Sequence, residues 1–256
     1  RNGLTVVVAE DTASARRWYD ELEFYTGELE LLHFPDWETL AYDAFSPHQD
    51  IVSERLATLH RLPSISQSPI LLVVTIQTLM QRVTPRAYID GHVMQLGVGQ
   101  RFVIESERVR LDGAGYVATD TVTGRGEYAV RGSLMDIFPM GSPDPLRVDL
   151  FDDEIESLRT FDTETQRTLA RVDHFELLPA KEFPLDDGAI ARFRDNWHNT
   201  FNVDVRRCSI YQDISEGISP SGIEYYLPLF FDGLGTLFDY LPETSLFVHE
   251  ADARLA

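Results

Sequence analysis

Two short runs of alternating residues carry the side chains best suited to binding another protein. In residues 146–151 (LRVDLF), successive side chains point to opposite faces of a strand, so the three aliphatic residues turn to the core while Arg147 and Phe151 turn outward. In residues 128–132 (YAVRG), the same alternation turns Arg131 outward. Arginine and exposed aromatic side chains are enriched where proteins bind one another. These three residues therefore predict a protein-binding surface.

A purely structural interpretation of the same residues stays open. Phe151 could end its strand and turn back into the core, while both arginines pair with local carboxylates. On pattern alone the two interpretations are evenly balanced.

Phosphate chemistry is the activity that the sequence most clearly argues against. A phosphate loop needs a glycine-rich turn followed by Gly-Lys-Ser/Thr, whose lysine reaches the β- and γ-phosphates. The chain has a single lysine, Lys181, and the turn after its first predicted strand reads Ala-Glu-Asp at 9–11, which would meet phosphate with carboxylates. We therefore expect no catalytic residue and no bound nucleotide in this chain.

Other reactive side chains show no spacing that chemistry requires. The histidines lack zinc-ligand spacing, and the acidic triplet at 152–154 lacks the spaced oxygen ligands of a calcium loop, so a solvated turn is favoured there. Cys208 has no activating motif, and residues 219–222 (SPSG) lack a nucleophile elbow. We expect no metal site.

Charge and composition narrow the possible partners. The 256 residues include 42 acidic and 22 basic side chains, a formal net charge of −20, which repels DNA phosphates. The sequence has no apolar run long enough to cross a bilayer, and a single cysteine favours a reducing cytoplasm. Because the first residue is Arg1 rather than Met, we expect a fragment of a longer protein.

The first part of the chain alternates strands with helices, which predicts an α/β fold with a parallel sheet flanked by helices. Residues 4–9 and 69–74 have the apolar, β-branched composition of buried strands. Asp11-Thr12 should cap a helix whose buried stripe includes Trp18, Leu22 and Tyr25. Ser46-Pro47 should begin a second helix, and Thr75 a third that ends at Pro85; these expectations define a first domain at 1–90.

Beyond residue 90 the pattern changes to short alternating runs separated by glycines. We expect an inserted β-rich antiparallel domain at 91–178, with one strand at 127–138, another at 146–151 and a return strand through Phe161. A helix with its apolar face on Ile190, Phe193, Trp197 and Phe201, followed by a strand at 245–248, marks a third segment at 179–256 that packs with the first.

Residues 126–139 (GEYAVRGSLMDIFP) resemble a motif shared by the excinuclease protein UvrB and the bacterial transcription-repair coupling factors. Further passages favour the coupling factors over UvrB: residues 36–40 (DWETL) with 45–50 (FSPHQD), 78–83 (TLMQRV) and 222–231 (GIEYYLPLFF). The resemblance covers essentially the whole chain.

The resemblance implies an amino-terminal, UvrB-like module of a protein that uses ATP and magnesium to displace stalled RNA polymerase from DNA. It implies that this module, a degenerate copy of a nucleotide-binding domain, recruits the excinuclease protein UvrA in nucleotide excision repair. RNA polymerase and DNA would be bound by other domains, and the carboxyl-terminal domain would cover the module until polymerase is engaged.

In the family, the binding site for UvrA includes two arginines and a phenylalanine that match Arg131, Arg147 and Phe151. A fragment of UvrB is the main alternative, but it would carry a phosphate loop and a tyrosine-rich hairpin, for which the short link 42–48 leaves no room. A second alternative is a small-molecule site at the carboxyl ends of the first sheet's strands.

Overall fold

The computed structural model describes residues 3–27, 29–41, 44–65 and 69–249. It confirms the α/β fold with a β-rich insertion. Part of the link 42–48, where no hairpin was expected, lies outside the described residues. No helix in the described ranges has the length and apolar composition to cross a membrane.

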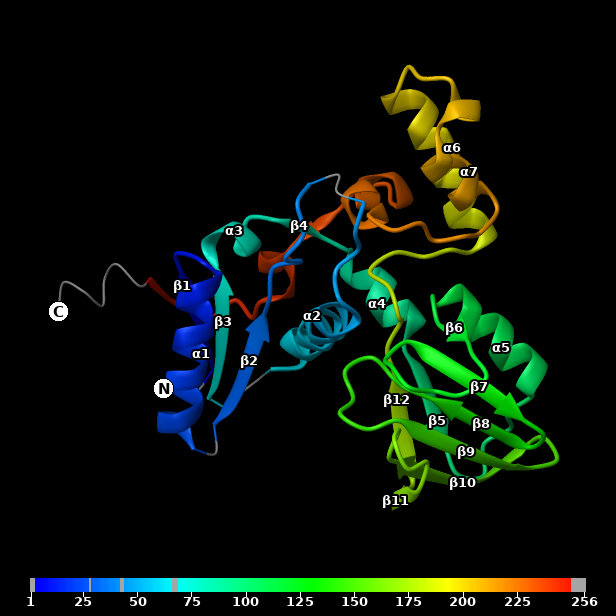
Figure 1. Ribbon diagram of the computed structural model, residues 1–256. Coiled ribbons are helices and arrows are strands. Elements are labelled where there is room, and N and C mark those ends of the chain that lie inside the picture. The colour runs from blue at the N-terminus through cyan, green and yellow to red at the C-terminus, as the bar shows by residue number, and fades with distance from the viewer. Residues whose placement is uncertain (1–2, 28, 42–43, 66–68, 250–256) are drawn as a thin grey trace.

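Four parallel strands form the first sheet, in the order β14-β1-β3-β2. They comprise β1 (Leu4–Ala9), β2 (Glu30–Phe34), β3 (Ile70–Thr75) and β14 (Leu246–His249). Both faces of the central strands are buried: Val6 and Val8 pack beneath α2 (Gln49–Arg61), whereas Val7 and Ala9 pack beneath α1 (Thr12–Thr26). The continuous apolar composition of β1 and β3 follows from this burial. Figure 1 labels β1, β3 and β2 beside α1 and α2.

Six strands form the second sheet, in the order β11-β10-β9-β8-β7-β6. They are β6 (Val117–Ala118), β7 (Glu127–Arg131), β8 (Leu134–Ile137), β9 (Leu146–Phe151), β10 (Glu154–Phe161) and β11 (Thr168–Val172). All neighbours are antiparallel except β6 and β7. The run 127–138 is thus a hairpin rather than one strand, and its turn includes Gly132 at φ 64°, in the left-handed region that glycine enters without strain.

The remaining helices and strands connect and cover the two sheets. They are η1 (Leu62–Ser64), α3 (Ile76–Leu79), β4 (Arg82–Val83), α4 (Arg86–His92), β5 (Met94–Gly97), α5 (Ile104–Gly113), β12 (His174–Leu177), α6 (Asp187–Thr200), η2 (Val205–Arg207), α7 (Ser209–Ser215), η3 (Ile223–Phe230), β13 (Gly235–Thr236) and η4 (Leu237–Tyr240). A small antiparallel pair joins β12 to β5, and another joins β13 to β4.

One hydrophobic core runs from the parallel sheet through α2 and α4 to the inner face of the six-stranded sheet. A second, aromatic core centres on α6 and η3, where Phe193 and Trp197 are buried. Ile190 and Phe201, which were expected beside them, are partly buried. The inner face of the six-stranded sheet joins the main core, and a small apolar cluster of Val122, Ala129, Phe138 and Phe161 covers part of its outer face. The rest of the outer face, which includes Arg131 and Phe151, is exposed.

Three expectations about helices are wrong. The helix expected at Ser46 begins at Gln49, because the Ser46 hydroxyl bonds the Glu224 carboxylate (2.9 Å) and the Gly222 amide (3.0 Å), so that His48 becomes the cap. The helix after Thr75 lasts only four residues because the chain then enters β4, and Pro85 begins α4 rather than ending a helix.

The third wrong expectation is the stripe of α1. Trp18 and Leu22 pack against the sheet, but Tyr25 is 79% exposed in the last turn. There it contacts the similarly exposed Phe24 edge to face, with ring centroids 5.1 Å apart.

Candidate protein-binding face

The strands of the six-stranded sheet alternate as their sequence predicted. The aliphatic side chains of β9 turn inward, where Val148 is fully buried and Leu150 is 6% exposed. Tyr128 on β7 is likewise buried. A tight turn with Asp152 at φ 52° follows β9 and returns the chain into β10.

The strand register brings the three candidate residues to one face. Arg131 lies opposite Leu134, and Leu134 lies opposite Asp149 on β9. Asp149 lies between Arg147 and Phe151 on β9. Arg131, two strands away on β7, is therefore level with Asp149 along the sheet. At about 4.8 Å between neighbouring strands, the Arg131 backbone lies roughly 10 Å from β9. The three side chains thus share one surface.

Phe151 is the most exposed of the three. It is 71% exposed at the end of β9, so it does not turn back into the core. A phenylalanine ring held in water by a rigid strand is a ready anchor for a partner's apolar surface.

The two arginines differ in how freely they can meet a partner. Arg131 is exposed and donates from its guanidinium to the Asp120 carbonyl (2.8 Å) and the Thr121 hydroxyl (2.9 Å). It pairs with no carboxylate among the described residues. Those two bonds use one nitrogen, which leaves the rest of the fork available.

Arg147 is already held by the protein. Its side chain is 16% exposed and forms a bidentate ion pair with the buried carboxylate of Asp136, at 2.7 and 2.8 Å. It also stacks on Phe161, 4.6 Å from the ring centroid. The hydrogen bonds to Asp136 raise the pKa of Arg147 above its ordinary value. The local pairing considered for both arginines therefore holds for Arg147.

Sequence reasoning missed Asp136 as a member of this face. The signal was present, because alternation along 134–137 places Asp136 on the same face as Leu134, the hairpin neighbour of Arg131. Its pairing with Arg147 depends on the register between β8 and β9, which cannot be predicted from the local sequence pattern.

The carboxyl edge of the parallel sheet, where a nucleotide would lie in related folds, carries carboxylates. Asp11 accepts a hydrogen bond from the Ser14 amide (2.7 Å) at the start of α1, and the bonds from Ser14 lower the Asp11 pKa. Asp36, just beyond β2, accepts from Gln81 (2.7 Å) and Thr78 (3.3 Å). An anion at this edge would meet the negative charge of these two carboxylates.

Lys181 has a structural role away from that edge. Its ammonium donates to the Ser219 hydroxyl (3.0 Å), its stem packs over Gly115, and burial lowers its pKa. The described residues bring no three metal-ligating side chains together.

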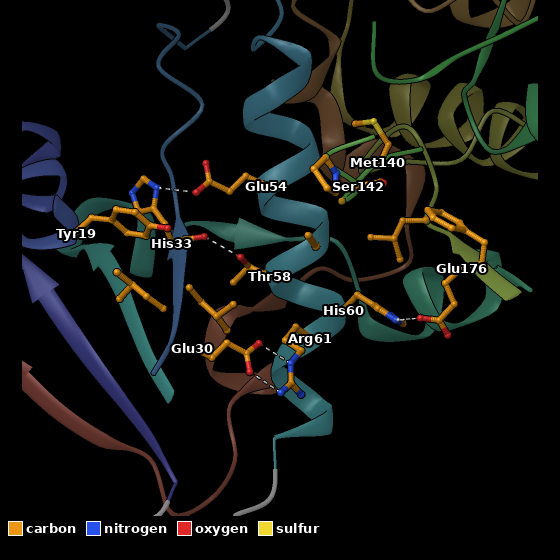
Figure 2. Close-up of a pocket in the computed structure, with 17 residues that line it drawn as sticks. Tyr19, Glu30, His33, Glu54, Thr58, His60, Arg61, Met140, Ser142 and Glu176 are labelled. Atoms are coloured by element: carbon orange, nitrogen blue, oxygen red, sulfur yellow. Dashed lines mark hydrogen bonds and ion pairs between the residues drawn. The ribbon is translucent and has the colours of Figure 1, made fainter. Parts of the chain in front are cut away.

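A cavity of about 630 Å³ lies where β2 and α2 meet the loop 140–143 and β12 (Figure 2). Its polar wall is paired within the protein: His33 with Glu54 (3.1 Å), His60 with Glu176 (3.3 Å), and Arg61 with Glu30 (2.7 Å). These pairs leave few polar side chains available to orient a ligand. We therefore interpret the cavity as a gap in the packing between the two sheets rather than as a binding site.

Comparison with known proteins shows which of them this chain resembles. Residues 94–183, which include the whole six-stranded sheet, match the UvrB interaction domain family. The chain is 48% identical over 251 residues, 98% of its length, to the transcription-repair-coupling factor of Escherichia coli (strain K12). It is 51% identical over 247 residues (96%) to that of Haemophilus influenzae, and 34% identical over 251 residues (94%) to that of Myxococcus xanthus.

The chain spans only 21% to 22% of the length of these relatives. The resemblance predicted from its motifs is nevertheless confirmed: residues 94–183 match the UvrB interaction domain family, and the chain is similar along nearly its whole length to one stretch of the transcription-repair coupling factors.

Proposed function

We propose that this chain is the recruiting module of a transcription-repair coupling factor and binds the excinuclease protein UvrA through the outer face of its six-stranded sheet. The match of residues 94–183 to the UvrB interaction domain carries the proposal. The exposure of Phe151 and Arg131 on the same face of the sheet supports the location of the site. In this function the chain works by binding and performs no chemistry of its own.

The rest of the coupling reaction belongs to other parts of the longer protein. ATP and magnesium would be used by the translocating domains, and those domains would contact DNA and RNA polymerase in the cytoplasm. Asp11 and Asp36 at the carboxyl edge of the parallel sheet support this division, because they oppose phosphate binding here. A carboxyl-terminal domain of the longer protein would cover the outer face in the resting state.

The relatives favour this proposal over a fragment of UvrB. Matches to coupling factors extend over nearly the whole chain, including the parts on either side of the interaction domain. A small-molecule function has no comparable support.

Calorimetric titration of the chain with cognate UvrA tests the proposal. We expect saturable binding, together with an unchanged melting temperature in ATP and magnesium. A bound nucleotide at a hundred times its Kd would add about 2.7 kcal/mol of stability, a shift that is readily measured. No binding to UvrA, or a clear stabilisation by ATP, would contradict the proposed function.

A further inference from the structure

Three arginines stand side by side on the outer face of the six-stranded sheet. Arg159 on β10 lies opposite Arg147 on β9, and on its other side opposite Arg171 on β11. On each strand, the residue adjacent in sequence to the arginine points inward: Val148 and Leu158 are buried in the core, and Val172 packs against it. All three arginines therefore point away from the core.

The positive charge of this row is only partly balanced within the chain. Arg147 pairs with Asp136, and Arg159 pairs with Asp149 at 2.8 Å. Arg171 is exposed and forms no ion pair with any residue that the structure describes. Like charges on directly opposite residues destabilise a sheet, and ion pairs within the described part of the fold balance the charges of Arg147 and Arg159 but not that of Arg171.

The row is unusual for this molecule. The formal net charge is −20, yet the outer face also carries Arg131, on the same face as the exposed Phe151. Guanidinium groups in fixed positions bind carboxylates with two parallel hydrogen bonds, and an acidic protein surface would be attracted to this face. DNA would be repelled by the rest of the chain, which favours a protein as the occupant.

We propose that the binding face continues from β7 and β9 across β10 and β11, and that Arg159 and Arg171 receive an acidic patch of the partner. This inference rests on the proposed function: the patch is a cluster of carboxylates on UvrA. Phe151 anchors one end of the contact, and Arg171 guides and orients the other through charge. Such rim charges act mainly on the association rate and on its salt dependence.

Charge reversal at Arg171 tests the extension, because this exposed side chain has no ion-pair partner among the described residues whose loss would disturb the fold. We expect Arg171→Glu to weaken binding to UvrA at least tenfold in low salt and to flatten the salt dependence of the affinity. Arg16→Glu, on the exposed side of α1, is the matched control with the same change in net charge, and it should bind as the unaltered chain does.

The possible results distinguish a failure of this extension from a failure of the proposed UvrA binding itself. Equal affinities for Arg171→Glu and Arg16→Glu, with a large loss for Phe151→Ala, would overturn the extension and leave the proposed function standing. If the unaltered chain does not bind UvrA, both fall. Saturable binding of a DNA oligonucleotide that Arg171→Glu abolishes, with UvrA bound as before, would show that the row binds nucleic acid and overturn the inference.

Discussion

At the scale of single residues, the three side chains predicted from the alternating pattern differ in how much they contribute to the stability of the fold. Phe151 is 71% exposed and contributes little to the core, whereas Arg147 holds a buried carboxylate in place. A loss of binding on substituting Arg147 would therefore mix a lost contact with a disturbed surface. Arg131 is exposed and, among the described residues, bonds only a carbonyl and a hydroxyl, so it should contribute less to the stability of the fold than Arg147 does.

Removal of the Arg147 side chain should destabilise the fold. Arg147→Ala leaves Asp136, which is 4% exposed, without its ion-pair partner, and we expect a loss of about 2–4 kcal/mol in the free energy of unfolding measured in urea. The double variant Arg147→Ala/Asp136→Ala should recover part of that loss. Arg131→Ala is the control and should stay within about 0.5 kcal/mol of the unaltered chain. An Arg147→Ala chain as stable as the original would show that the pair contributes nothing.

At the scale of elements, strands were easier to foresee than helix ends. The continuous apolar run of β1 and the alternation of β9 are local signals of burial, and both strands lie where the sequence placed them. The start of α2 was missed because Ser46 is bound to Gly222 and Glu224, far away in the sequence. The position of β14 beside β1, and the rows of the outer face, depend on pairings that no local pattern contains.

The start of α1 gives a prediction that depends on pH. Hydrogen bonds from Ser14 lower the pKa of Asp11 in the folded chain, so its ionised form stabilises the fold above the ordinary pKa of about 3.9. That contribution is lost as the pH falls through the lower, folded pKa. Asparagine caps a helix without titrating.

The melting temperature of the original chain should therefore fall relative to that of Asp11→Asn as the pH drops from about 5 to about 3. We propose differential scanning calorimetry of both proteins across this range. A difference in melting temperature that stays constant with pH would show that the Asp11 carboxylate does not cap α1.

At the scale of the whole molecule, a buried ion pair ties together segments that are distant in sequence. Arg55 on α2 is fully buried and bonds Glu182 (2.6 Å), in the link that follows the β-rich domain, and the Pro35 carbonyl (2.7 Å) after β2. Its guanidinium stacks on Phe34 and Trp37, at 4.3 and 5.1 Å from their ring centroids. This cluster holds the segment that follows the β-rich domain against α2 and the end of β2.

Breaking this pair from one side should be among the most costly substitutions. Arg55→Ala leaves the Glu182 carboxylate buried and unpaired, and we expect about 3–5 kcal/mol of lost stability in urea unfolding. Arg55→Met with Glu182→Gln should restore much of it, because no buried charge remains and the glutamine oxygen can still accept from Trp37. A double variant as unstable as Arg55→Ala would mean that shape, rather than charge, decides the cost.

The central claim is that this molecule binds UvrA by the outer face of its six-stranded sheet, and Phe151 tests it most directly. Phe151→Ala should leave the free energy of unfolding within about 0.5 kcal/mol, since the ring is 71% exposed. In calorimetric titration it should cost about 2 kcal/mol of binding free energy, roughly thirtyfold in affinity. Phe24→Ala, which removes a similarly exposed ring from α1, should bind as the original does. Equal affinities for Phe151→Ala and Phe24→Ala would contradict the claim.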